Sequence, residues 1–175
     1  MTKKDGPEEK FFRLSEKSGT EKPETGKKED LPKHIRSALN ILDYADNTER
    51  RLREKLFRKN YTPDEIEEAV AYVKDIGCLN DAEYIKRAAE YMAEVKLYGR
   101  YRIKKALAEK GFSFDDIGAL DLSAFDFFAI CEKRIEKSRY KSRQALCAAL
   151  QRYGFTRDEI EEAVENTGVF PEDGE

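Results

Sequence analysis

The sequence DEIEEAV, which holds four carboxylates in seven residues, occurs twice, at 64–70 and again at 158–164. Neighbouring carboxylates can share a proton and act as an acid–base pair, so the repeat could be a duplicated catalytic element. A third, related segment begins at Asp115, but Gly118 and Ala119 replace two of its glutamates. Acids that follow a Thr or Ser by three residues are also typical of helix capping boxes. We therefore expect these acids to cap helices and not to perform catalysis.

Other residues that commonly carry chemistry are sparse. His34 is the only histidine, so a triad of the Ser–His–Asp or Cys–His type would depend on it alone. Cys78, Cys131 and Cys147 are odd in number, widely spaced and set among apolar neighbours, which favours small buried side chains in a reducing compartment. The sequence contains no glycine-rich phosphate loop and no zinc-ligand spacing. We expect no enzyme activity, no cofactor and no metal.

Basic residues are the remaining candidates for function. The stretch 96–110 carries six basic residues against one acid, as does 133–143, and tyrosines are interleaved in both. On a helix through the first stretch, Ile103 and Leu107 face inward and the cations lie opposite, where they could bind phosphates or an acidic protein surface. The candidate partner-binding residues are Lys96, Arg100, Arg102, Lys104, Lys105, Arg139, Lys141 and Arg143.

Apolar residues recur at helical spacing along the whole middle of the chain, and no segment alternates as a strand does. Three such stripes are Ile35, Ala38, Leu39 and Leu42; Tyr84, Ile85, Ala88, Met92 and Val95; and Phe127, Phe128, Cys131 and Ile135. The pattern predicts an all-α fold.

Three segments align without gaps, beginning at Leu52, Ile103 and Leu146. Each ends a helix at a residue that tolerates the left-handed conformation (Asn60, Gly111 or Gly154), which is followed by an aromatic residue. A Thr or Ser with an acid three residues later then predicts a capped new helix. Each aligned segment follows one of the apolar stripes, so we expect tandem three-helix repeats, three units forming an elongated, curved helical array.

The expected organisation is a charged, disordered N-terminal arm at 1–32, repeats at 33–79, 80–121 and 122–168, and an acidic tail at 169–175. Charge follows this division, since residues 33–156 hold 24 basic and 20 acidic residues whereas 157–175 hold one Arg and eight acids. No apolar run approaches the roughly 18 residues of a membrane span, and the N-terminus lacks an apolar signal segment. We expect a cytoplasmic monomer.

The order and spacing of several motifs resemble the RecX family of bacterial recombination regulators. They are Leu52-Arg-Glu-Lys-Leu56, Gly77-Cys-Leu-Asn-Asp81, and Gly99-Arg-Tyr-Arg-Ile103 continuing through Lys110-Gly111. The resemblance extends over about residues 35–166 and includes the three-helix repeat. Departures from the family pattern are Asn60 where glycine is usual, Arg51 where an acid is frequent, and Cys78 where an aromatic residue is common.

The resemblance implies a regulator without enzyme activity that binds the RecA recombinase and its nucleoprotein filament. Such a protein would modulate, and by expectation inhibit, RecA ATPase, filament growth and strand exchange in DNA recombination, DNA repair and the SOS response. Weak direct DNA binding would accompany this activity. Tandem repeats suit the role because several contacts along a filament add up in affinity.

Two other functions fit the same sequence. Two helices joined by a glycine turn are also typical of a helix-turn-helix DNA-binding module, which would bind duplex DNA tightly without RecA and with strong salt dependence. A generic helical scaffold would show neither activity.

Overall fold

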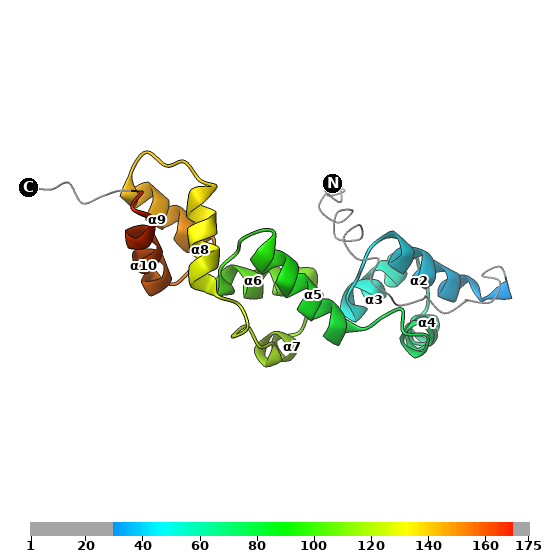
Figure 1. Ribbon diagram of the computed structural model, residues 1–175. Helices are drawn as coiled ribbons and strands as arrows, with labels where there is room; N and C mark the ends of the chain where they lie inside the picture. Colours follow the sequence, from blue (N-terminus) through cyan, green and yellow to red (C-terminus); the bar gives the residue numbers. More distant parts are fainter. Residues whose placement is uncertain (1–29, 170–175) are drawn as a thin grey trace, which may run out of the picture. The chain divides into compact units, whose positions relative to one another are not determined.

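The computed structural model describes residues 30–169, and all of the regular secondary structure in that range is helical. The predicted all-α fold is therefore confirmed. Residues 1–29 of the predicted N-terminal arm and 170–175 of the predicted acidic tail lie outside the described residues. The helices are α2 (Lys33–Tyr44), α3 (Glu49–Phe57), α4 (Pro63–Asp75), α5 (Asp81–Glu94), α6 (Arg100–Lys110), α7 (Phe114–Ala119), α8 (Phe127–Glu136), α9 (Arg143–Arg152) and α10 (Arg157–Thr167), as labelled in Figure 1.

The helices gather into two compact units. Among the described residues, unit 1 comprises 30–84 together with 110–112, and unit 2 comprises 85–109 and 113–169. Figure 1 shows α2, α3 and α4 together within unit 1, and α8, α9 and α10 together within unit 2. The three predicted repeats at 33–79, 80–121 and 122–168 are defined by sequence similarity and not by contacts, and this division stays a prediction.

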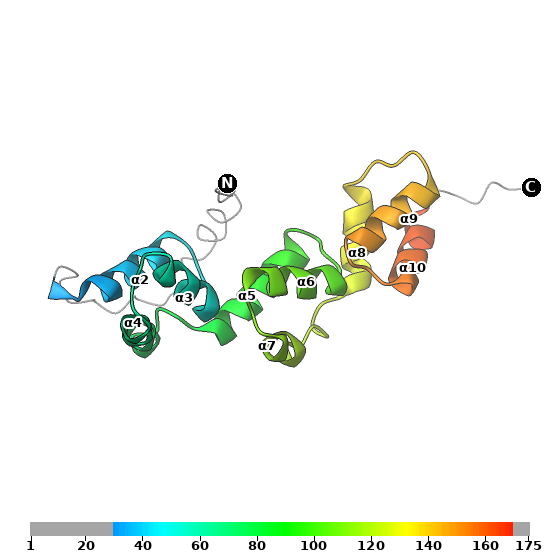
Figure 2. The ribbon, with the colours of Figure 1, turned by 180° about the vertical axis from the view of Figure 1, so that it is seen from behind.

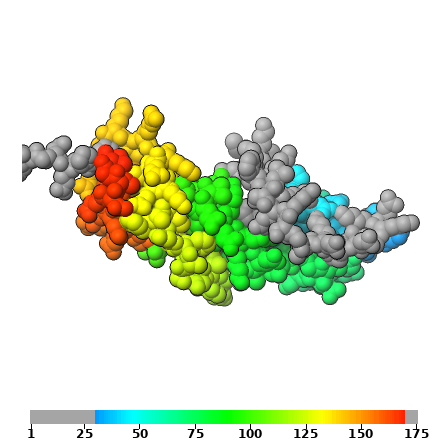
Figure 3. Space-filling view, in the orientation of Figure 1, coloured from blue at the N-terminus to red at the C-terminus, as the bar shows by residue number. Residues whose placement is uncertain are grey.

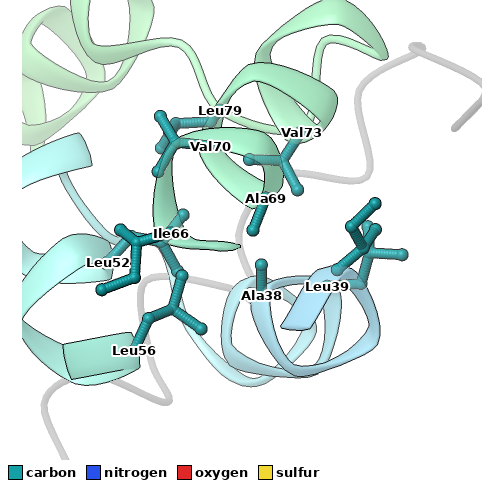
Figure 4. Packing of buried hydrophobic residues seen from close by; sticks show 10 residues of the cluster. Ala38, Leu39, Leu52, Leu56, Ile66, Ala69, Val70, Val73 and Leu79 are labelled. Atoms are coloured by element: carbon teal, nitrogen blue, oxygen red, sulfur yellow. The ribbon is translucent and has the colours of Figure 1, made fainter. Parts of the chain in front are cut away.

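Unit 1 is held together by apolar side chains from α2, α3 and α4. Ala38 on α2 and Ala69 on α4 are fully buried and point toward one another in Figure 4. Two side chains as small as these let the helices approach closely. Leu52 and Leu56 of α3 are fully buried beside Ile66 of α4. The rest of the cluster consists of Ile35, Leu39, Val70, Val73 and Leu79.

The three corners contain the capping structure that the sequence predicts. Thr62, Ser113 and Thr156 each begin a helix with a full capping box, in which the acid three residues later bonds back to the cap. The acids of the repeated DEIEEAV therefore include the capping glutamates Glu65 and Glu159. Because these carboxylates accept backbone N–H groups at helix starts, their interpretation as capping residues is confirmed for one acid of each copy.

The residues that end the preceding helices are also as predicted. Asn60, Gly111 and Gly154 have φ values of 63°, 101° and 89°, in the left-handed region. After Asn60, the N–H of Tyr61 donates to the carbonyl of Leu56 at 3.5 Å, and Phe155 repeats the pattern with Leu150 at 3.3 Å. These hydrogen bonds are those of a Schellman ending, which turns the chain sharply.

One residue of the second predicted stripe is placed differently. Val95 is 59% exposed, because α5 ends at Glu94 and the chain turns away from the helix axis. Leu97 is buried in its stead, with an unusual positive φ of 53°. This turn directs the chain toward the beginning of α6.

The last three helices of unit 2 pack around Phe127, Cys131 and Ile135 of α8, which are buried as the third stripe predicts, whereas Phe128 is half-buried. Figure 2 shows α9 beside α8 and α10 from the reverse side. Figure 3 shows α8 (yellow) and α10 (red) adjoining on one face. Phe128, Glu162, Glu165 and Asn166 line an open depression between these two helices.

Candidate partner-binding surface

The start of α6 is joined to the end of α9 by direct backbone contact. The N–H of Gly99 donates to the carbonyl oxygen of Tyr153 at 2.8 Å, and the N–H of Tyr101 donates to that of Gly154 at 3.2 Å. A methyl group on Gly99 would lie 2.3 Å from the carbonyl carbon and oxygen of Gly154, so only glycine fits there. N–H groups at the start of α6, which have no partner within that helix, thus donate to carbonyl groups at the end of α9. These hydrogen bonds fix α6 within unit 2.

A related contact occurs in unit 1. When Leu52 is aligned with Ile103, Thr48 takes the position of Gly99, and the Thr48 hydroxyl lies 3.4 Å from the carbonyl oxygen of Lys110, to which it donates. A methyl group on Gly111 would lie 3.0 Å from the Thr48 hydroxyl oxygen. In unit 2, the corner at Gly154 therefore packs against Gly99 at the start of α6. In unit 1, the corner at Gly111 packs in the same way against Thr48 at the start of α3.

The α6 helix has the two faces that the sequence predicts. Ile103 and Leu107 are fully buried. Lys104 and Lys105 are exposed, and Tyr101 is exposed by 64%. Positions three and four apart lie on one helix face, so Tyr101, Lys104 and Lys105 form one exposed patch, here named the α6 patch.

Arg100 and Lys96 have partners within unit 2. Arg100 donates from Nε to a carboxylate oxygen of Glu159 at 3.1 Å, and its guanidinium lies over the Phe127 ring at 4.9 Å from the centroid. The Lys96 ammonium lies 5.7 Å from the centroid of the Tyr91 ring. Arg100 therefore links the start of α6 to the capping box of α10, a role that the sequence alone did not indicate.

Arg102 lies in an open groove with aromatic walls. Its guanidinium is 5.5 Å from the centroid of the Tyr98 ring. The groove has a volume of about 410 Å³ and is lined by Tyr98, Arg102, Tyr140, Ala149, Arg152 and Tyr153, all of unit 2. It is named the tyrosine groove below.

The wall of the tyrosine groove is braced from α8. The guanidinium of Arg134 lies over the Tyr153 ring at only 3.6 Å from the centroid, and its buried Nε has no hydrogen-bond partner among the described residues. Arg134 is thus held by stacking, which fixes the orientation of Tyr153. The Tyr98 and Tyr153 rings have centroids 6.1 Å apart and planes inclined by 39°.

The remaining predicted residues come from the second basic stretch. Arg139 and Lys141 are exposed in the loop between α8 and α9, on either side of Tyr140. Arg143 is the first residue of α9 and is half-buried. The structure therefore brings Arg102 and the Tyr140 loop to one groove, although their stretches are far apart in sequence.

The predicted set contains none of the tyrosines of this region, although Tyr98 and Tyr140 belong to the tyrosines noted between the basic residues, and it also lacks Arg134, Arg152 and Tyr153. Arg134 belongs to the second basic stretch, and a charge count includes it without distinguishing it from its neighbours. Arg152 and Tyr153 stand immediately before Gly154, which has a left-handed conformation. Their position before this corner is the only sequence feature that marks them as candidates for a site.

His34 pairs with two glutamates, and the three cysteines differ in burial. His34 is buried in the first turn of α2, where its Nε2 lies 3.0 Å from a carboxylate oxygen of Glu68 and its Nδ1 lies 3.9 Å from Glu65. Burial raises the pKa of the Cys131 thiol to about 12, whereas Cys78 and Cys147 are only half-buried. The described residues include no cluster of His, Cys, Asp or Glu that could hold a metal ion. Among them, no helix has the length and apolar character of a membrane span.

Comparison with known proteins finds a family model and relatives that all carry the name RecX. Residues 35–72 match the family model described as RecX, first three-helix domain. Regulatory protein RecX of Clostridium perfringens (strain 13) is 32% identical over 146 residues, which cover 75% of this chain and 67% of the relative. Regulatory protein RecX of Vibrio cholerae (El Tor Inaba N16961) is 37% identical over 81 residues, covering 46% of this chain and 53% of the relative.

A solved structure shares the fold. The crystal structure of RecX from Lactobacillus salivarius superposes with a TM-score of 0.66 at 21% sequence identity, covering 78% of this chain and 95% of that one. A second crystal structure of a regulatory protein RecX gives a TM-score of 0.62 at 20% identity, covering 76% of this chain and 70% of that one. The two relatives and the second crystal structure carry the name regulatory protein RecX.

Proposed function

Because the chain belongs to the RecX family of regulatory proteins, we propose that it binds the RecA recombinase and its filament on DNA. In this proposal the protein acts by binding and not by catalysis. It inhibits RecA ATPase, filament growth and strand exchange, and so acts in recombination and DNA repair.

The observation that carries the proposal is the α6 patch. Tyr101, Lys104 and Lys105 are exposed on a helix whose opposite face is fully buried and whose first residues are bonded to another helix. An aromatic side chain beside cations on a rigid element is typical of protein-binding hot spots, because little conformational freedom is lost on binding.

The charges of the predicted set differ in their availability. Lys104 and Lys105 are exposed and suit contact with an acidic surface of RecA, whereas Arg100 already donates to Glu159. We therefore assign the direct contact to Lys104 and Lys105, with Arg102 beside them, and assign Arg100 a positioning role. Exposed charges of this kind mainly accelerate association, and salt weakens their effect.

The experiment is a titration of RecA ATPase on single-stranded DNA with this protein at two salt concentrations. The double substitution Lys104→Glu and Lys105→Glu is expected to weaken inhibition by about tenfold or more at low salt, because two attractive contacts become repulsive. Tyr101→Ala is expected to weaken inhibition at both salt concentrations, since an aromatic contact depends little on screening.

A control with the same change in net charge is Lys59→Glu with Lys86→Glu, two exposed lysines outside the predicted set. If this control and the Lys104/Lys105 variant inhibit equally, the α6 patch is not the contact. If the unaltered protein leaves RecA ATPase unchanged at saturation, the proposed function itself fails. Loss of ATPase at substoichiometric protein favours capping of filament ends, and loss only near saturation favours binding along the filament.

A further inference from the structure

The tyrosine groove differs in composition from the depression between α8 and α10, which two glutamates line. Its lining residues are three tyrosines, two arginines and one alanine, and none of them carries a carboxylate. Tyrosine rings offer flat faces for stacking, and guanidinium groups offer paired donors for phosphate oxygens. The groove therefore suits a ligand that is both planar and anionic.

The geometry of Tyr153 favours stacking from the groove side. Arg134 covers the ring at 3.6 Å from the centroid, yet Arg134 is not among the lining residues of the groove. Tyr153 therefore presents to the groove a surface that Arg134 leaves uncovered. With Arg134 braced against it and its carbonyl bonded to Gly99, the ring is held in place before any ligand arrives.

The size of the groove and its surroundings narrow the choice of ligand. A volume of about 410 Å³ is enough for one planar base with its sugar. Exposed cations lie on the two elements that supply Arg102 and Tyr140, namely Lys104 and Lys105 on α6, and Arg139 and Lys141 beside Tyr140. Such cations match the phosphates that precede and follow one nucleotide in a strand.

We infer that the tyrosine groove binds an unpaired nucleotide of a single-stranded nucleic acid. The base stacks on Tyr153 with Tyr98 beside it, and Arg102 and Arg152 hold the adjacent phosphates. A base is available for such stacking only when its faces are not covered by neighbours in a duplex, so single strands are preferred over duplexes. The inference needs no RecA, and it stands or fails separately from the proposed function.

The test measures anisotropy of a fluorescein-labelled oligothymidylate of about 15 nucleotides, titrated with the full chain at low salt without RecA. An oligonucleotide of equal length with abasic sites throughout carries the same phosphates and no bases. The intact strand is expected to bind about tenfold more tightly than the abasic strand, because each stacked base contributes to affinity.

Variants identify the groove as the site. Tyr153→Leu and Tyr98→Leu are each expected to weaken binding of the intact strand by about tenfold and to leave binding of the abasic strand unchanged. Tyr153→Phe retains the ring and is expected to bind as the unaltered protein does. Tyr44→Leu, at a half-exposed tyrosine of unit 1, is the matched control and is expected to have no effect. Because Tyr98 lies in the segment between α5 and α6 and not beside α9 in the sequence, it provides a second variant if Tyr153→Leu impairs folding.

Several outcomes would overturn the inference. Equal affinity for intact and abasic strands would show binding to phosphates alone, and equal affinity for duplex would exclude recognition of an unpaired base. If the tyrosine variants weaken RecA inhibition but bind the oligonucleotide normally, the groove receives a protein segment instead. Loss of RecA inhibition in the Lys104/Lys105 variant has no bearing on these comparisons, so the two proposals are tested independently.

Discussion

Gly99 donates its backbone N–H to the carbonyl oxygen of Tyr153 at 2.8 Å, and Gly99 lies just before the second aligned segment whereas Tyr153 lies within the third. This hydrogen bond sets the beginning of α6 against the end of α9. It thereby places both the α6 patch and one wall of the tyrosine groove. The two candidate sites of unit 2 share this one backbone contact.

Gly99→Ala is expected to destabilise unit 2 by about 1 to 3 kcal/mol, because the new methyl group would overlap the Gly154 carbonyl. Thermal unfolding followed by circular dichroism would measure the change. Gly118→Ala is the matched control, since Gly118 lies within α7 and a methyl group there meets nothing within 4 Å. The control is expected to be neutral or stabilising by about 0.5 to 1 kcal/mol, and equal destabilisation by both would contradict the account of Gly99.

Arg100→Ala is expected to cost about 1 to 2 kcal/mol of unfolding free energy, since it removes the partner of the largely buried Glu159 carboxylate. Urea unfolding would measure it. Arg157→Ala provides the comparison, because Arg157 pairs with Glu161 on the exposed face of α10 and should contribute less than about 0.5 kcal/mol. An Arg100 variant that is as stable as the unaltered protein but fails to inhibit RecA would show that Arg100 contacts the partner directly.

Glu49 should make stability depend on pH. Hydrogen bonds from Arg53, and next from Lys74, hold the pKa of this carboxyl below its ordinary value. A lowered pKa in the folded state means that the stabilisation is complete above the unfolded pKa of about 4.3 and is lost as pH falls through the folded pKa.

Glu49→Gln is accordingly expected to cost about 0.5 to 1 kcal/mol at pH 7, a modest value because the pair is partly exposed to solvent. The difference between the variant and the unaltered protein should shrink toward zero below about pH 4, as urea unfolding at a series of pH values would show. A difference that stays constant with pH would exclude an ionic origin.

The three cysteines should differ in reactivity toward iodoacetamide at pH 8. With a pKa of about 12, Cys131 has almost no thiolate in the folded protein, and it is expected to react at least about a hundredfold more slowly than a thiol of ordinary pKa. Mass spectrometry after timed labelling would distinguish it from Cys78 and Cys147, which are half-buried. In urea all three should react alike, and rapid labelling of Cys131 without denaturant would contradict its burial.

Local features of the fold could be predicted because their causes are local. Thr62 with Glu65, and likewise Thr156 with Glu159, form capping boxes within a few residues of chain, so the sequence pattern predicts them directly. The left-handed Asn60 and the buried Leu52 follow from residue type and helical spacing in the same way.

Long-range features could not be predicted in this way. Helical spacing places Arg100 near Lys104 on one helix, but its actual partner Glu159 lies on α10, and no local pattern links the two. The tyrosine groove requires that Tyr98 and Tyr153 meet, which depends on a backbone contact that leaves no periodic trace. Val95 was placed in the core by periodicity because the end of α5 at Glu94 has no distinct sequence signal.

The contact between Gly99 and Gly154 also limits how this protein can be altered by mutation. Where two side chains meet in a core, enlarging one can be offset by shrinking the other. Here the atoms that a Gly99 methyl group would strike belong to the main chain, which every amino acid carries, so a smaller residue at 154 does not exist. A genetic search for second-site suppressors of Gly99→Ala should therefore recover reversion to glycine or gains in stability elsewhere, and no compensating exchange at position 154.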